Sequence, residues 1–122
     1  MTKLLIVEDE HPILRGYQDY FTRQGYVVDV AHDGEEGLGK AEHFVPDLIL
    51  LDILMPKMDG LTMLKKLRAL PRFKETPVIV LTNLDTSESI GKAVEQGTTH
   101  YLLKNNYGLE ELDQKIRSVL KT

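Results

Sequence analysis

The 122-residue chain contains no cysteine and no tryptophan, and it has no apolar run long enough to span a bilayer. Without cysteine, the fold can use neither disulfide bonds nor thiolate metal sites, which are typical of small secreted domains and zinc modules. A membrane-spanning helix needs about 20 mostly apolar residues, so we expect no membrane segment. No secretory leader pattern opens the sequence. These absences favour a cytoplasmic protein.

Positive charge is also scarce. Lys and Arg number 15 against 19 Asp and Glu, which gives a formal net charge of −4 and no basic surface of the kind that binds nucleic acid. Hydrophobic residues make up 42% of the chain and charged residues 28%, a composition typical of globular proteins. We therefore expect a single domain over residues 1–122, with neither nucleic acid nor a membrane as a direct partner.

Short apolar runs alternate with longer amphipathic segments along the whole chain. Apolar and β-branched runs predict strands over residues 3–7, 26–31, 47–52, 77–82 and 100–104. Helical spacing of apolar residues predicts helices over residues 12–24, 33–44, 61–70, 87–96 and 109–120. Parallel strands need crossover connections, so this alternation predicts an α/β fold with a five-stranded parallel sheet and helices on both faces.

Polar side chains stand where four of the five predicted strands end. The first strand leads into Glu8 and Asp9, the third ends at Asp52, the fourth at Thr82 and the fifth at Lys104. In open parallel sheets, ligands bind beyond the carboxyl ends of the strands, near the point where the strand order reverses. Each residue alone is more often a helix cap or a surface group. Their joint placement at one edge predicts a functional site.

These residue types suit phosphoryl transfer. Crowded carboxylates repel one another unless a cation joins them, and oxygen ligands with room for water suit Mg²⁺. The ion could also hold a phosphoryl oxygen. The carboxylate of Asp52 could then attack phosphorus and form an aspartyl phosphate. Thr82 could donate a hydrogen bond to a second phosphoryl oxygen, and the ammonium of Lys104 could pair with a third.

Other residues with possible chemistry have simpler interpretations. The four histidines, His11, His32, His43 and His100, lack the close paired spacing that is typical of zinc sites. We interpret them as exposed or partly packed side chains rather than ligands. Tyr101 lies in the fifth predicted strand, and its position there favours packing.

Four segments, "KLLIVEDE", "DLILLDILMPKMDG", "PVIVLTN" and "GTTHYLLK", together resemble the receiver domain of two-component response regulators. The resemblance extends over the whole chain to its last helix. It implies a flavodoxin-like, doubly wound fold with strand order 2-1-3-4-5. It also implies a signalling domain whose only catalysis is its own phosphorylation and dephosphorylation.

The resemblance assigns the acidic residues as well. Asp52 matches the phosphoacceptor of the family, and Glu8 and Asp9 match the acidic pair that serves Mg²⁺. Asp9 and Asp52 would be direct ligands, Glu8 would act through water, and the backbone carbonyl of Leu54 would complete the protein ligands.

The remaining assignments concern the response to phosphorylation. Thr82 matches the switch hydroxyl, Lys104 the phosphate-pairing lysine, and Tyr101 the aromatic residue that changes rotamer when Thr82 moves. The implied phosphoryl donor is a sensor histidine kinase or a phosphotransfer protein. The implied output face, for an unknown downstream target, consists of the fourth helix, the fifth strand and the fifth helix.

The chain departs from the family pattern at several positions. Asn105 follows Lys104 where the family usually has proline, often with a cis bond; a non-proline cis bond costs about 3 kcal/mol, so we expect trans. Thr98 replaces a small alanine. Leu54 and Leu84 flank the site, and neither side chain can orient a hydrolytic water. We therefore hypothesise slow loss of the phosphoryl group.

Three alternatives are open at this point. A phosphatase of the haloacid-dehalogenase type needs a second aspartate two residues after the first, where this chain has Leu54. A nucleotide- or flavin-binding module usually has a glycine-rich turn after the first strand, where this chain has three acids at residues 8–10. A degenerate receiver that serves only as a scaffold is compatible with Asn105.

Overall fold

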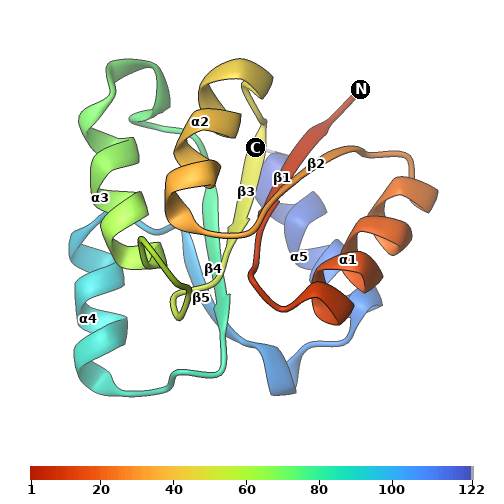
Figure 1. Ribbon diagram of the computed structural model, residues 1–122. Helices are drawn as coiled ribbons and strands as arrows, with labels where there is room; N and C mark the ends of the chain where they lie inside the picture. The colour runs from red at the N-terminus through yellow and green to blue at the C-terminus, as the bar shows by residue number, and fades with distance from the viewer. Residues whose placement is uncertain (122) are drawn as a thin grey trace.

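The computed structural model describes residues 1–121, which form a five-stranded parallel sheet between two layers of helices (Figure 1). The strands are β1 (Lys3–Val7), β2 (Val27–Ala31), β3 (Leu48–Leu51), β4 (Val78–Thr82) and β5 (His100–Leu103). They lie in the order β2-β1-β3-β4-β5, and all neighbouring pairs are parallel. The predicted fold class and strand order are confirmed.

The helices are α1 (His11–Arg23), α2 (Gly34–Phe44), α3 (Gly60–Ala69), α4 (Ser87–Glu95) and α5 (Leu109–Leu120). Helices α1 and α5 cover one face of the sheet, and α2, α3 and α4 lie on the other (Figure 1). Two short 3-10 turns, η1 (Pro71–Phe73) and η2 (Lys104–Asn106), were not predicted. Among the described residues, no helix has the length and apolar character needed to cross a membrane.

The central strands are apolar on both faces because each face is covered by helices. Successive side chains of a strand point to opposite faces. In β1, Leu4 and Ile6 belong to the core cluster that includes Phe21 of α1, whereas Leu5 and Val7 belong to the cluster under α2 and α3. These four apolar residues of β1 are at most 1% exposed. This double burial explains the continuous apolar runs in the sequence.

A close approach of backbone segments fixes the loop that follows β3. Gly60, the first residue of α3, donates its N–H to the carbonyl oxygen of Ile53 at 2.9 Å. A Cβ atom at position 60 would lie 2.1 Å from the carbonyl oxygen of Asp52, a distance that no side chain can occupy. The carboxylate of Asp59 caps the helix by accepting from the N–H of Thr62 at 2.8 Å. Glycine therefore allows α3 to begin directly beside the end of β3.

Candidate functional site

Three carboxylates meet at the carboxyl edge of β1 and β3. These strands are neighbours in the sheet, and Val7 pairs with Leu51, so the next residues along each strand also lie near one another. Glu8, Asp9 and Asp52 each place a carboxylate oxygen within 4.8 Å of the other two. Glu8 is 2% exposed and Asp52 is 6% exposed, so most of this negative charge is removed from water.

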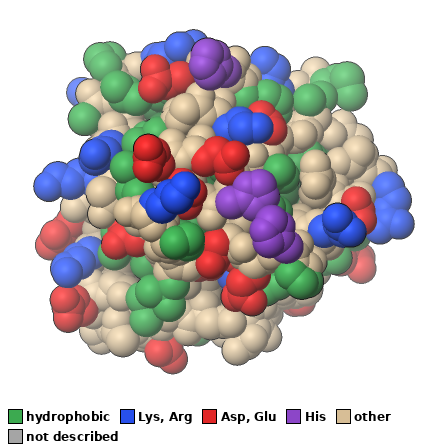
Figure 2. Space-filling model, in the orientation of Figure 1, with side chains coloured by type: hydrophobic (Ala, Val, Ile, Leu, Met, Phe, Trp, Pro, Cys, Tyr) green, Lys and Arg blue, Asp and Glu red, His purple; other side chains and the backbone are tan. Residues whose placement is uncertain are grey.

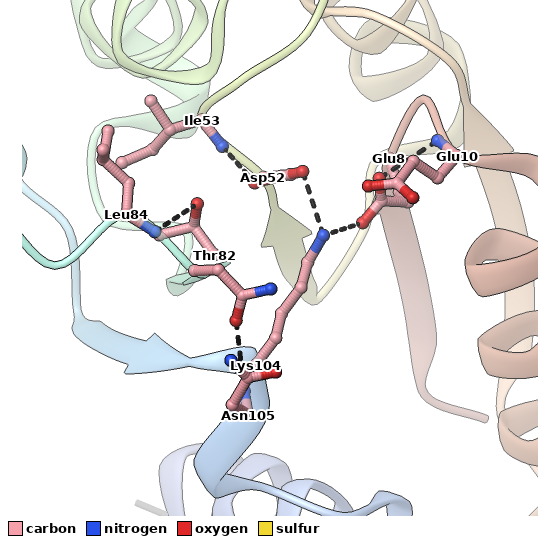
Figure 3. A network of polar contacts seen from close by, with 9 residues as sticks. Glu8, Glu10, Asp52, Ile53, Thr82, Leu84, Lys104 and Asn105 are labelled. Atoms are coloured by element: carbon pink, nitrogen blue, oxygen red, sulfur yellow. Dashed lines mark hydrogen bonds and ion pairs between the residues drawn. The ribbon is translucent and has the colours of Figure 1, made fainter.

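Lys104 brings a positive charge into the same place from the end of β5. Its Nζ forms an ion pair with Oε1 of Glu8 and a second with Oδ2 of Asp52, the latter at 3.0 Å (Figure 3). The lysine side chain is 10% exposed, so it is nearly as buried as its partners. Lys104 lies in the 3-10 turn η2 rather than in the predicted strand. One ammonium among three carboxylates leaves an excess of negative charge.

Burial and charge act in opposite directions on the pKa values of this cluster. Burial raises the pKa of Glu8 above its usual value, and the hydrogen bond from Lys104 offsets only part of that effect. For Lys104, burial alone would lower the pKa. The hydrogen bond to Glu8 and the charge of Asp52 outweigh it, so the pKa of Lys104 is raised. Lys104 therefore keeps its proton and its positive charge, and the three carboxylates together carry more negative charge than this one ammonium compensates.

Thr82 and Tyr101 both form hydrogen bonds with the backbone of Leu84, in the loop after β4. Thr82 is the last residue of β4 and is 1% exposed; its Oγ1 accepts from the N–H of Leu84 at 3.3 Å (Figure 3). The hydroxyl of Tyr101 donates to the carbonyl oxygen of the same Leu84. Tyr101 is half-buried and packs against a small cluster that includes Ile53 and Val80. The N–H of Leu84 is therefore bound by Thr82, and its carbonyl oxygen is bound by Tyr101.

The peptide bond between Lys104 and Asn105 is trans, as expected. The N–H of Asn105 donates to Oδ1 of Asn83 at 3.2 Å, a bond that proline could not form. Asn83 follows Thr82 directly, so this bond joins the loops after β4 and β5. The role of Asn83 was not predicted, because only the pairing of β4 with β5 brings the two loops together.

Two further features surround Asp52. Its Oδ1 accepts from the N–H of Ile53 at 2.7 Å, which fixes the carboxylate relative to the following loop. Leu54 is 62% exposed, so an apolar residue two positions after Asp52 reaches solvent. The donor set of the cluster consists of carboxylate oxygens, which are the ligands that Mg²⁺ prefers. Glu8, Asp9 and Asp52 could therefore hold this ion.

Residues 4–117 match the response regulator receiver domain family. The chain belongs to this family. The general function of a receiver domain is that of a phosphoacceptor switch in two-component signalling, so the chain is a signalling domain. The family resemblance is thereby confirmed, and neither a phosphatase of the haloacid-dehalogenase type nor a nucleotide- or flavin-binding module fits.

Relatives of known sequence and structure agree with this assignment. Response regulator ArlR of Staphylococcus aureus is 36% identical over an alignment of 122 positions, which covers 99% of this chain and 53% of that protein. The receiver domain described here thus spans about half the length of the curated relatives it matches. The chemotaxis protein CheY4 of Vibrio cholerae is 32% identical, with a TM-score of 0.91 over 98% of both chains.

A third relative is the BeF3-activated N-terminal receiver domain of Klebsiella pneumoniae RstA. It is 28% identical, with a TM-score of 0.90 over 99% of this chain and 100% of that one. Together these similarities establish the family and the flavodoxin-like fold.

Proposed function

We propose that Asp52 accepts a phosphoryl group from a phosphorylated histidine of a sensor kinase or a phosphotransfer protein. The observation that carries this proposal is the position of Asp52, which is buried among Glu8, Asp9 and Lys104. Glu8, Asp9, Asp52 and the backbone carbonyl of Leu54 would hold Mg²⁺. When bound, this ion would neutralise charge on the carboxylates and on the incoming phosphoryl oxygens.

The chemical step needs only one nucleophile. A carboxylate oxygen of Asp52 attacks phosphorus while the bond from phosphorus to the donor nitrogen breaks, and the electron pair of that bond leaves with the imidazole. The product is an aspartyl phosphate. Lys104 already contacts Asp52, so its ammonium is in position to pair with a phosphoryl oxygen once the group has been transferred.

The hydrogen bonds of Leu84 suggest how phosphorylation of Asp52 would alter the position of Tyr101. The Thr82 hydroxyl would exchange its contact with the Leu84 N–H for a hydrogen bond to a phosphoryl oxygen. The Leu84 carbonyl, which accepts from Tyr101, would then shift, and the tyrosine would change rotamer. Phosphorylation would bias an equilibrium between two packed arrangements that exist beforehand.

The proposed output face consists of α4, β5 and α5. Ile90 and Val94 of α4 are 38% and 64% exposed, which gives this face apolar contact area for a downstream protein. We further propose that residues 1–122 act as one receiver domain in the cytoplasm. The acidic net charge of −4 supports partners other than nucleic acid or a membrane surface.

The decisive experiment is intact mass spectrometry after incubation with Mg²⁺ and acetyl phosphate. We expect the mass of one phosphoryl group on the parent chain, and none on Asp52→Asn or in the presence of EDTA. A gain that survives Asp52→Asn would contradict the assignment of the acceptor. If no gain appears on the parent chain, NMR with beryllofluoride, the activating ligand named for the RstA domain, tests the scaffold alternative. Absence of spectral change would support the scaffold.

The lifetime of the phosphorylated form is a second expectation. Leu54 and Leu84 carry no polar side-chain atom that could orient a water molecule for attack on the aspartyl phosphate. We therefore expect loss of the phosphoryl group to take minutes or longer on the isolated domain. The decay can be followed by intact mass after removal of the donor. A half-life of seconds would contradict this expectation.

A further inference from the structure

Two histidines that are far apart in the sequence lie side by side in the structure. His11 is the first residue of α1, and His32 follows the last residue of β2. Their ring centroids are 4.9 Å apart with an interplanar angle of 39°, and two neighbouring histidine side chains are visible on the face shown in Figure 2. The sequence spacing does not reveal this pair, because the parallel pairing of β1 with β2 brings the two loops together.

Glu36 orients one of the two rings. Its Oε1 lies 2.8 Å from Nδ1 of His32 and also accepts from the backbone N–H of His32. A carboxylate accepts only, so Nδ1 carries the proton and Nε2 of the neutral ring keeps its lone pair. A carboxylate bound to the far nitrogen of a histidine is the usual second partner of a metal-binding imidazole.

The spacing of the rings suits one tetrahedral ion. Zinc binds imidazole nitrogen at about 2.0–2.1 Å, so two imidazoles on one tetrahedral ion have centroids about 5 Å apart. Both side chains reach solvent, and His32 lines an open groove with four other residues: Asp33, Glu35, Glu36 and Lys57. Three of these four carry negative charge, which favours a cation there. Because Glu36 holds the ring of His32, the exposed ring of His11 would turn to aim a nitrogen at the same ion.

We propose that His11 and His32 form a second metal site, for a divalent transition ion such as Zn²⁺, with Glu36 as its positioning residue. The donor chemistry separates it from the cluster of Glu8, Asp9 and Asp52, because imidazole selects zinc, copper or nickel while carboxylate oxygens select magnesium. The ion would join the first residue of α1 to the loop after β2. This proposal is independent of the phosphoacceptor role of Asp52.

The test is a calorimetric titration of the full, tag-free chain with Zn²⁺ in the presence of excess Mg²⁺. We expect one Zn²⁺ per chain. Replacing a ligand, as in His11→Asn or His32→Asn, should weaken binding about tenfold or more, and Glu36→Gln should weaken it about tenfold through loss of orientation. The matched control, His43→Asn, and the variant Asp52→Asn should bind as the parent chain does.

NMR of the parent chain gives a measurement that needs no variant. The Nε2 resonance of His32 should shift on addition of Zn²⁺, whereas the signals of His43 should not. The proposal fails if no saturable binding is found, if both histidine variants keep the parent affinity, or if Asp52→Asn abolishes binding. The last result would place the zinc in the carboxylate cluster.

Discussion

At the scale of single residues, Lys104 is the group that makes a buried cluster of acids compatible with folding. It is the cation that contacts both Glu8 and Asp52. Removing one partner of a buried ion pair is costly because the other charge stays buried without compensation. The same cluster could bind Mg²⁺, and a bound ion would then neutralise part of the negative charge that Lys104 leaves uncompensated.

Replacing Lys104 with Met should show how much of the acidic charge the lysine neutralises and how much a bound Mg²⁺ ion can neutralise in its place. The variant keeps the length of the side chain but leaves Glu8 and Asp52 unpaired, so we expect a loss of about 3 kcal/mol in the free energy of unfolding with EDTA present. Excess Mg²⁺ should restore more stability to Lys104→Met than it adds to the parent chain. Urea unfolding followed by circular dichroism, with EDTA or with Mg²⁺, measures both effects.

The control for this variant is Lys92→Met. Lys92 pairs with Glu88 on the surface of α4, where the two side chains are 57% and 78% exposed. Breaking an exposed pair of this kind should change stability by less than about 1 kcal/mol, and Mg²⁺ should make no difference to the change. Equal losses in the two variants would contradict the role given to Lys104.

At the scale of secondary-structure elements, the junction between β3 and α3 sets the position of Asp52. A methyl group at Gly60 would collide with the backbone of Asp52, whereas nothing lies within 4 Å of a Cβ at Gly39 in α2. Gly60→Ala should therefore lower the free energy of unfolding by about 2 kcal/mol or more, because the backbone must move apart. Gly39→Ala, in an exposed helix interior, should raise it by about 1 kcal/mol.

Urea unfolding of both variants tests whether the free energy of unfolding falls in Gly60→Ala and rises in Gly39→Ala. Gly60→Ala should also reduce labelling by acetyl phosphate, because the displaced loop carries Asp52 and the carbonyl of Leu54. Gly39→Ala should leave labelling as it is in the parent chain. If Gly60→Ala does not lower the free energy of unfolding, the close approach at Gly60 does not constrain the fold.

The elements themselves could be predicted because their signals are local. The run of Leu48 to Leu51 indicates a strand buried on both faces, and the spacing of Leu64 and Leu67 indicates one buried helix face. All five strands and five helices were predicted, and no boundary differs by more than one residue. The turn η2 could not be predicted from local sequence, because Lys104 directly follows the apolar run of β5 and was predicted to be part of that strand. In the structure Lys104 begins the turn and forms ion pairs with Glu8 and Asp52, which are distant in the sequence.

At the scale of the whole molecule, the order of the strands determines which side chains meet. The rule that ligands bind beyond the carboxyl ends of parallel strands was sufficient to predict that Glu8, Asp52 and Lys104 share one edge. It could not predict that Lys104 contacts both acids, because that depends on the reach of one side chain past the ends of β4 and β3. Contacts such as those of Asn83 with Asn105 and of His11 with His32 are likewise invisible to sequence spacing.

A buried hydrogen bond joins α5 to the residue before β2, at the end of the sheet opposite to the acidic cluster. Tyr26 is 8% exposed, and its hydroxyl donates to Oδ1 of Asp113 at 2.6 Å. Arg117 pairs with the other oxygen of the same carboxylate at 3.2 Å. Burial, followed by the hydrogen bond to Asp113, raises the pKa of Tyr26 well above its usual value. A charged phenolate here would face a carboxylate.

This contact predicts how the stability of the molecule depends on pH. The neutral phenol of Tyr26 contributes fully below the unfolded-state pKa of about 10. As pH rises above that value, the unfolded chain releases the proton while the folded chain keeps it. The free energy of unfolding should therefore fall by up to about 1.4 kcal/mol per pH unit from this group. In Tyr26→Phe that part of the slope should vanish, although the variant is less stable at neutral pH because Oδ1 of Asp113 loses its donor. Urea unfolding between about pH 9 and about pH 11 measures both slopes, and equal slopes in the two proteins would show that Tyr26 ionises as readily in the folded chain as in the unfolded one.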